Sequence, residues 1–243
     1  PPADARRTFS LRKPPPLSTA NLATKTASLR RVVRAWFRAN ARDLPWRRTR
    51  DPYRIWLAEI MLQQTRVETV LNYYRRFTKA IPTVARLAAA DEAVVLKLWE
   101  GLGYYGRARN LHKAARTVLT RYGGDLPRTA EEWRKLPGVG RYTAAAVASI
   151  AFGERVAVLD GNVKRVLARM CGMRECIDEG PVTRRLWSIA EALVPAQAPG
   201  DWNQAMMELG ARICTPRRPR CAECPVNRWC DCLLYTSPSP RDS

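Results

Sequence analysis

Residues 136–153 read LPGVGRYTAAAVASIAFG and carry the strongest structural signal in the chain. Two glycines, Gly138 and Gly140, lie between the helical patterns Glu131–Lys135 and Tyr142–Phe152. Glycines at this spacing let the backbone turn sharply and direct its N–H groups outward at the start of the next helix. With Arg141 beside them, they predict an anion site whose natural ligand is a DNA phosphate. A plain turn between two helices is the alternative, because a lone GxG is a weak signal.

Outward from this stretch, apolar residues recur at helical spacing in nearly every segment. The stripe in Arg54–Lys79 lapses over Gln63–Arg66, so we expect a break there. Only Arg155–Leu159 (RVAVL) resembles a strand, and one strand has nothing to pair with. The sequence therefore predicts an all-α fold. The other expected helices are Leu29–Phe37, Ala93–Trp99, Arg107–Tyr122, Asn162–Met170, Pro181–Leu193 and Asn203–Ile213.

The chain is strongly basic: its 243 residues include 42 Lys and Arg against 22 Asp and Glu, a formal net charge of +20. The excess extends through Arg30–Arg50, Arg107–Arg121 and Arg212–Arg220, so it belongs to the folded body. Such a charge favours a polyanionic partner, nucleic acid first, over a merely solvated basic surface. No apolar run approaches the ~18 residues of a membrane span, so we expect no membrane partner.

Both ends of the chain look different from the middle. Residues 1–28 form a proline-containing basic segment without a sustained apolar period, which we expect to be disordered. Residues 233–243 (LLYTSPSPRDS) are expected to be a disordered or non-native tail.

Four cysteines are clustered in the C-terminal part as C-x6-C-x2-C-x5-C: Cys214, Cys221, Cys224 and Cys230. Four thiolates so close in a loop without its own core suit a tetrahedral sulfur site, which holds zinc or a [4Fe–4S] cluster. The single CxxC pair favours iron–sulfur, because zinc knuckles usually carry two. Cys232 is a nearby spare, and Cys171 and Cys176 are expected to be buried free thiols.

Two carboxylates are candidates for acid–base chemistry. Glu59 is flanked by Trp56, Ile60 and Leu62, so we expect burial to raise its pKa, which suits a general acid. Asp160 precedes a helix, where N–H donors and the helix dipole should keep it ionised. The simpler roles are a rim glutamate and a helix N-cap. His112, the lone histidine, is expected on a helix surface.

These motifs together resemble the helix-hairpin-helix, iron–sulfur DNA glycosylases. LPWR (44–47), WLAEIMLQQTRV (56–67), GLGYYGRARNL (101–111) and WNQAMMELGARICTP (202–216) are similar to the MutY-type adenine DNA glycosylases, over about residues 29–230. This family flips adenine out of duplex DNA and excises it where it is mispaired with 8-oxoguanine or G.

The resemblance implies a role for each matching residue. Glu59 would protonate adenine, and Asp160 would stabilise the cationic sugar, directly or through a covalent adduct. Tyr142 and Asn162 would support that chemistry. Residues expected to line the adenine pocket are Arg42, Trp46, Arg47, Leu62 and Gln204, while Gln64 and Tyr104 would fill the stack around the opposing lesion.

Two rival functions remain open. Endonuclease III-type enzymes share the hairpin, the Asp and the cluster, but carry a Lys nucleophile where this chain has Tyr142. Tyrosine cannot form the Schiff base, so we expect a monofunctional enzyme without lyase activity. The second rival is a non-enzymatic, metal-stabilised DNA-binding module.

The resemblance also implies two helical lobes: a six-helix lobe spanning 45–154 with the hairpin, and a second built from 29–44 plus 155–232 with the cluster. We expect a monomer that acts inside the cell, in the nucleus or mitochondrion of a eukaryote or the cytoplasm of a bacterium. Family members usually continue into a Nudix-like domain, for which this chain has no room before Ser243. We therefore expect weaker discrimination between A opposite 8-oxoguanine and A opposite G.

Overall fold

The computed structural model describes residues 19–231, with side chains from Thr26 onward. All regular elements in this range are helical. The α-helices are α1 (Thr19–Asn40), α2 (Pro52–Leu62), α3 (Val67–Ala80), α4 (Val84–Ala89), α5 (Glu92–Trp99), α6 (Gly106–Tyr122), α7 (Ala130–Trp133), α8 (Arg141–Phe152), α9 (Gly161–Met170), α10 (Gly180–Leu193) and α11 (Pro199–Arg212). Three short 3-10 helices are η1 (Pro45–Arg47), η2 (Cys221–Glu223) and η3 (Asn227–Trp229). The prediction of an all-α fold is confirmed.

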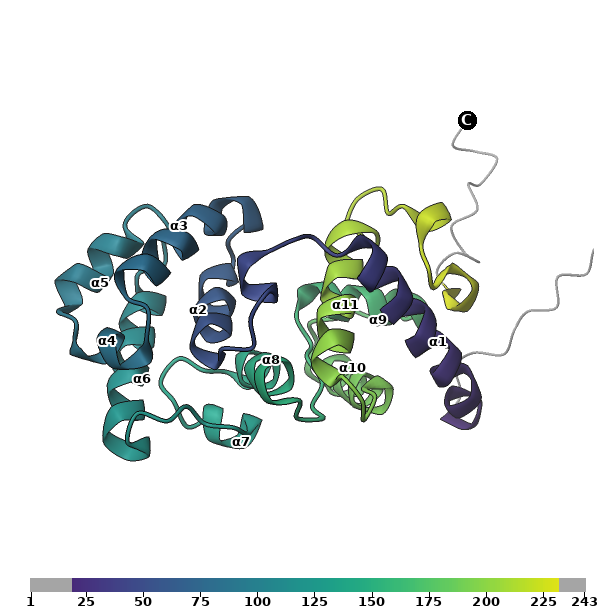
Figure 1. Cartoon of the computed structure of the whole chain (residues 1–243). Coiled ribbons are helices and arrows are strands. Elements are labelled where there is room, and N and C mark those ends of the chain that lie inside the picture. Colours follow the sequence, from purple (N-terminus) through teal and green to yellow (C-terminus); the bar gives the residue numbers. More distant parts are fainter. Residues whose placement is uncertain (1–18, 232–243) are drawn as a thin grey trace, which may run out of the picture.

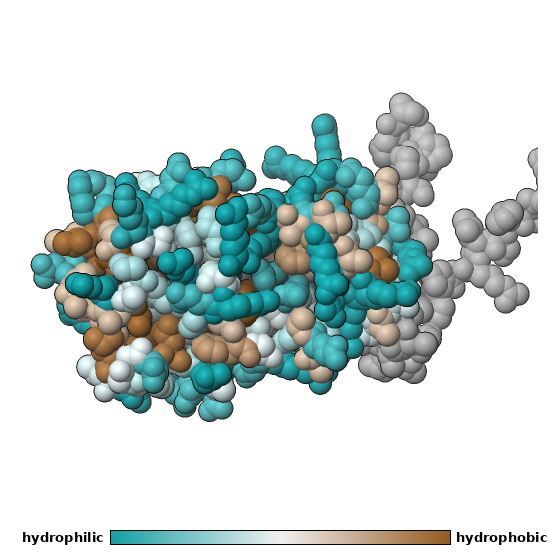
Figure 2. All heavy atoms as spheres, in the orientation of Figure 1, coloured by the Kyte–Doolittle hydropathy of each residue, from teal (hydrophilic) through white to brown (hydrophobic). Residues whose placement is uncertain are grey.

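The helices form two groups that lie side by side (Figure 1). One group holds α2 to α7, and the other holds α1 with α9, α10 and α11. Helix α8 joins them, because it packs against α2 and α7 on one side and α11 on the other. Hydrophilic side chains cover much of the face seen in Figure 2, with smaller hydrophobic areas between them. The two-lobed architecture is thus present, and the lobe boundaries at 44/45 and 154/155 stay a prediction.

The first helix starts earlier than the sequence predicts. Helix α1 begins at Thr19, inside the 1–28 segment expected to be disordered, and it ends at Asn40, beyond the expected Phe37. The reason its start is hard to read is that 19–28 lack the apolar period that begins at Leu29, which is buried together with Val33. The expectations for 1–18 and for Cys232–Ser243 lie outside the described residues.

The predicted break in the 54–79 stripe is confirmed. Helix α2 ends at Leu62, and α3 begins at Val67. Asp51 starts α2 by accepting hydrogen bonds from the backbone N–H groups of Tyr53 (2.9 Å) and Arg54 (3.4 Å), which satisfies two otherwise unpaired donors. The break leaves Gln64 on a loop directly after the helix that carries Glu59.

Tryptophan rings fill the core of the first group. Trp56 of α2 and Trp133 of α7 are fully buried and meet edge to face with ring centroids 5.3 Å apart. Trp99 of α5 meets Phe77 of α3 in the same geometry at 6.1 Å. Edge-to-face pairs of this size add to the hydrophobic stabilisation from their large buried area. The Trp56–Trp133 pair fixes α2 against α7, and α2 carries Glu59.

The strand-like segment RVAVL runs extended between α8 and α9 and belongs to no sheet. Asn203 of α11 provides hydrogen-bond partners for its backbone: its side chain donates to the carbonyl of Val156 (2.9 Å) and accepts from the N–H of Val158 (3.4 Å). A buried extended segment needs such partners because unpaired backbone groups are costly. One buried amide thus takes the place of a neighbouring strand.

Helix α11 packs directly against backbone at two glycines. A Cβ atom on Gly200 would lie 2.5 Å from the carbonyl oxygen of Ser149 in α8. A Cβ atom on Gly210 would lie 2.6 Å from the Cβ of Asn162 in α9. Both distances are shorter than any ordinary non-bonded contact of a Cβ atom, so only glycine lets α11 approach α8 and α9 this closely.

The expectation that His112 lies on a helix surface is wrong. His112 is only 2% exposed, and its Nε2 atom makes no hydrogen bond to the part of the chain that the structure describes. Helices α4, α5 and α2 all pack against α6, so α6 buries a wider face than its own sequence pattern indicates. Among residues 19–231, no helix is long and apolar enough to cross a membrane.

Candidate active site

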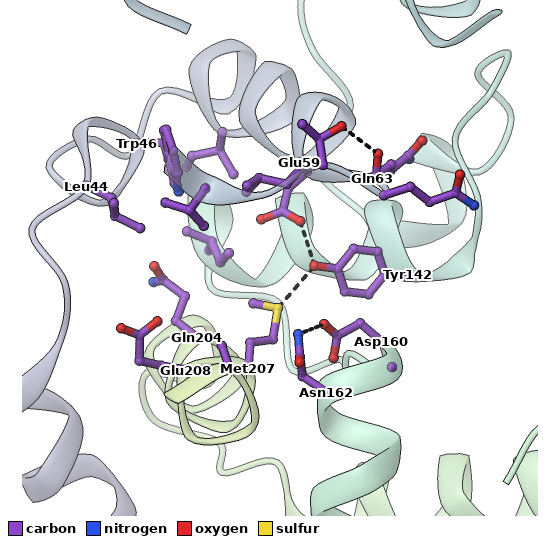
Figure 3. Close-up of a pocket in the computed structure, with 18 of the residues that line it drawn as sticks. Leu44, Trp46, Glu59, Gln63, Tyr142, Asp160, Asn162, Gln204, Met207 and Glu208 are labelled. Carbon is purple, nitrogen blue, oxygen red and sulfur yellow. Dashed lines mark hydrogen bonds between the residues drawn. The ribbon is translucent and has the colours of Figure 1, made fainter. Parts of the chain in front are cut away.

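A cavity of about 700 Å³ opens between the two helix groups (Figure 3). Its walls come from α2, α8, α9, α11 and the loops around η1 and Tyr104. It brings together side chains that are far apart in the sequence, such as Arg42 and Glu208, which are separated by 166 residues. All predicted catalytic and pocket residues line it: Arg42, Trp46, Arg47, Glu59, Leu62, Gln64, Tyr104, Tyr142, Asp160, Asn162 and Gln204.

Glu59 projects from α2 into this cavity and is 6% exposed. The Tyr142 hydroxyl, from α8, donates to its Oε2 at 2.7 Å and also lies 3.1 Å from the sulfur of Met207. Burial raises the pKa of Glu59 to about 7, although the Tyr142 hydrogen bond and the charge of Arg47 oppose the rise. The expectation of a raised pKa is confirmed, so this carboxyl can hold a proton near neutral pH.

Asp160 is the N-cap of α9, as the sequence predicts. Its Oδ1 accepts from the N–H of Val163 and its Oδ2 from the side-chain amide of Asn162, both at 2.8 Å. These donors favour the ionised form, as expected, but they are not the largest effect on its pKa. Burial in the cavity raises the pKa of Asp160 and outweighs these donors, which alone would lower it.

Glu208 of α11 is a third carboxylate on the cavity wall, and it is completely buried. Arg42 donates to both of its oxygens, from Nε at 2.8 Å and from Nη2 at 2.7 Å, and Arg47 donates to Oε2 at 2.8 Å. Burial alone would raise the pKa of Glu208, but the two guanidinium groups outweigh it and lower the pKa to about 2. This cluster fixes η1 and its Trp46 beside the cavity.

Gln64 and Tyr104 lie at the solvent side of the cavity, on two loops from different helices. Both have left-handed backbone conformations, with φ of +55° and +49°, which are strained for residues other than glycine. Tyr104 is 63% exposed, which is unusual for a large aromatic side chain. The fold therefore presents these two side chains outward.

The three residues of the predicted anion site, Gly138, Gly140 and Arg141, lie in the turn before α8 and at its start. Gly138 has φ of +73°, and a Cβ there would lie 2.6 Å from the Cβ of Asn110, so glycine is required. Gly140 is the N-cap of α8 with an ordinary extended conformation and no capping side chain. Arg141 packs over the Trp187 ring (3.6 Å to its centroid) and donates to Glu191 at 2.5 Å. Its guanidinium thus joins α8 to α10, and phosphate binding by Arg141 stays a prediction.

The four clustered cysteines, Cys214, Cys221, Cys224 and Cys230, are half-buried. Burial, together with the charges of Cys214, Cys221 and Cys230, raises the pKa of Cys224 to about 11, so the four sulfurs lie close enough to interact. In residues 19–231 no three ligand side chains are arranged around a single metal ion. Four soft thiol donors fit an iron–sulfur cluster, which binds sulfur and takes more room than one ion.

The prediction for the other two cysteines is wrong: Cys176 is exposed and Cys171 is half-buried. Both lie in the segment between α9 and α10 rather than in a core.

Sequence reasoning missed Glu208, Met207 and Arg107 as cavity residues. An acidic residue between the apolar Met207 and Leu209 was the available signal for Glu208. Arg107 gives no signal, because its partners are backbone carbonyls from other segments.

Residues 57–192 match the HhH-GPD superfamily of base excision DNA repair proteins, and the chain belongs to that superfamily. Residues 214–230 match the iron–sulfur binding domain of endonuclease III, so the C-terminal loop is an iron–sulfur cluster site.

Curated relatives include human adenine DNA glycosylase, 47% identical over 85% of this chain and 39% of the relative. The adenine DNA glycosylase of Buchnera aphidicola (from Acyrthosiphon pisum) is 38% identical over 82% of this chain and 57% of the relative. The chain thus spans about two-fifths of the human protein it matches. Among solved structures, a thermostable thymine-DNA glycosylase aligns with a TM-score of 0.80 at 33% identity, over 88% of this chain and 98% of that one. A complex of endonuclease III with DNA, at 23% identity and a TM-score of 0.70, shares the fold.

Proposed function

We propose that this protein is a monofunctional DNA glycosylase that hydrolyses the N-glycosidic bond of adenine mispaired with 8-oxoguanine or G. The observation that carries the proposal is a single cavity that holds both Glu59, which is buried and protonatable, and Asp160, the N-cap of α9. The relatives named adenine DNA glycosylase support the choice of base.

Breaking a glycosidic bond needs a proton on the leaving base and stabilisation of the cationic sugar. Glu59 supplies the proton, because its pKa of about 7 leaves much of it protonated at neutral pH. Tyr142 orients the carboxyl through its 2.7 Å hydrogen bond.

Asp160 supplies the negative charge that the cationic sugar requires. The donors Val163 N–H and Asn162 hold the carboxylate in place. Although burial raises its pKa in the free protein, a cationic sugar beside it favours the ionised form.

Base flipping brings adenine into the cavity, and its volume of about 700 Å³ is ample for one purine. Trp46, Leu62 and Gln204 offer an apolar wall and an amide for the base edge. Gln64 and Tyr104, exposed on their loops, fill the space that the flipped base leaves in the duplex.

The Arg and Lys excess and the hairpin glycines Gly138 and Gly140 supply contacts to DNA phosphates. Cys214, Cys221, Cys224 and Cys230 hold the [4Fe–4S] cluster, which stabilises the loop and serves no electron transfer in this hydrolysis.

The endonuclease III-type activity is disfavoured at the position of its nucleophile. Tyr142 occupies that position, and its hydroxyl donates a hydrogen bond to Glu59 and lies next to the sulfur of Met207. A phenol forms no Schiff base, so no β-elimination follows base removal.

A single-turnover assay on duplexes with A opposite 8-oxoguanine, A opposite G, and A opposite T tests the proposal. We expect abasic sites in the first two duplexes that become strand breaks only after alkali. Breaks without alkali would indicate a lyase. No product from cluster-loaded protein that still binds the duplex would indicate a non-enzymatic binding module.

A further inference from the structure

Arg107, on the first turn of α6, makes an unusual set of contacts for a charged side chain. Its guanidinium lies in the wall of the active-site cavity, and none of its hydrogen bonds goes to a carboxylate. Its partners are backbone carbonyls and one hydroxyl, drawn from two separate segments of the chain.

The first terminal nitrogen binds the end of α2. Nη1 donates to the carbonyls of Ile60 (3.1 Å) and Met61 (2.9 Å), and also to that of Gln63. These carbonyls have no partner within the helix, because the chain leaves helical geometry after Leu62. Nη1 therefore caps the helix that carries Glu59 and holds the residue next to Gln64.

The second terminal nitrogen binds the turn that precedes α6. Nη2 donates to the hydroxyl of Thr65 (3.2 Å) and to the carbonyls of Leu102 (3.4 Å) and Gly103 (3.2 Å). The indole N–H of Trp99 donates to the same Gly103 carbonyl at 3.1 Å. One planar fork thus joins the loop of Gln64 to the turn of Tyr104.

Both joined segments are strained. Gln64 and Tyr104 have positive φ, which is costly for residues with a Cβ, whereas Gly101 and Gly103, at φ of +89° and +76°, adopt such angles without strain. Strained backbone persists only where surrounding contacts determine it. The guanidinium also packs on two aromatic rings, 5.5 Å from the centroid of Trp99 and 5.4 Å from that of Tyr104.

We propose that Arg107 is a positioning residue that ties the two DNA-probing loops, at Gln64 and Tyr104, to each other and to the C-terminal end of the helix carrying Glu59. This inference rests on the proposed function for its effect on base excision. The physical reason for arginine is its fork, whose two ends reach acceptors in different segments. Lysine offers donors from a single point and can serve only one side.

The test compares Arg107→Lys with Arg109→Lys in cluster-loaded protein. Arg109 lies on the same helix, but it is exposed and pairs with Glu92 at 3.3 Å. Hydrogen exchange of peptides covering 60–66 and 100–106 reports the loops directly, without any reaction. We expect faster exchange in both peptides for Arg107→Lys and unchanged exchange for Arg109→Lys. Unchanged exchange in Arg107→Lys would overturn the proposal.

A double-mutant cycle with Tyr104→Ala then separates positioning from a general loss of stability. On A opposite 8-oxoguanine we expect Arg107→Lys to lower the single-turnover rate by on the order of tenfold or more, as misplaced groups do. If Arg107 acts through the Tyr104 turn, the double variant should be hardly slower than Tyr104→Ala alone. Rates that multiply would overturn the proposal.

Thr65→Val is the second variant in case Arg107→Lys folds poorly. It removes one acceptor of Nη2 and keeps the guanidinium, so we expect faster exchange in 60–66 and little change in 100–106. If Thr65→Val exchanged at the wild-type rate in both peptides, the proposed tie between the two loops through Arg107 would be contradicted. If the wild type releases no adenine at all, the proposed function fails, while the exchange measurements still decide the role of Arg107.

Discussion

Glu59 and Glu208 project from α2 and α11 into the same cavity, and both are shielded from solvent (Figure 3). Glu59 has one neutral donor, the Tyr142 hydroxyl, and its pKa is raised to about 7. Glu208 has the guanidinium groups of Arg42 and Arg47, and its pKa is lowered to about 2. Burial is common to both, so the partners decide the protonation state. One carboxyl is suited to give a proton, the other to hold a wall in place.

The largest expected effect comes from removing the proton donor. We expect Glu59→Gln to lower the single-turnover rate on A opposite 8-oxoguanine by at least about 10³-fold, because a positioned general acid contributes on that scale. Stability should hardly fall, since a neutral amide replaces a buried acid. A rate within tenfold of wild type would remove Glu59 from the chemistry, and duplex affinity of the same variant serves as the control.

Glu208→Gln should show the opposite pattern, with stability as the main loss. Removing a buried carboxylate leaves two guanidinium groups facing each other, which costs about 3 kcal/mol in free energy of unfolding. Urea denaturation of cluster-loaded protein measures it. Glu175→Gln is the matched control, because Glu175 pairs with Arg185 on the surface and such pairs contribute below about 1 kcal/mol. Equal losses of unfolding free energy in the two variants would show that Glu208 contributes no more to stability than a surface ion pair.

The two glutamates should also respond to pH in opposite directions. The folded-state pKa of Glu59 lies above its ordinary 4.5, so its contribution to stability is present below pH 4.5 and is lost as pH rises through 7. The contribution of Glu208 to stability is present above pH 4.5 and is lost as pH falls toward 2. Between pH 4.5 and 7 we expect wild type to lose about 2 kcal/mol relative to Glu59→Gln. A parallel pH dependence of the two proteins would contradict the raised pKa.

Tyr142→Phe should give the smallest effect. Without the hydroxyl, the pKa of Glu59 rises further, because the lost hydrogen bond stabilised the charged carboxylate. We expect the high-pH decline in excision rate to move to higher pH and the maximal rate to fall about tenfold through poorer orientation. A decline that moves to lower pH would show that Tyr142 does not donate to Glu59.

The same differences explain which features of the site were predictable from the sequence. The raised pKa of Glu59 was predictable because its apolar neighbours Trp56, Ile60 and Leu62 are adjacent in sequence. The cluster around Glu208 was not, because Arg42 lies 166 residues away. The helix period likewise gave the break at Gln63–Arg66, since that signal is local.

Asp160 lies between these cases. Its capping contacts to Val163 and Asn162 are local and follow from its place before a helix. Its burial comes from the cavity walls, which distant elements supply, and that burial raises its pKa against the effect of the local donors. The burial of His112 was not predictable for the same reason, because the helices that pack against α6 come from elsewhere in the chain.

The contact between Gly210 and Asn162 has a consequence for reading natural variation in this chain. Alanine differs from glycine by one methyl group and ranks as a mild change on any similarity scale. At position 210 that methyl would lie 2.6 Å from the Cβ of Asn162, whose amide holds Asp160. A variant that looks harmless by chemical similarity would therefore displace the carboxylate, and genetic surveys should grade Gly210→Ala with the damaging substitutions.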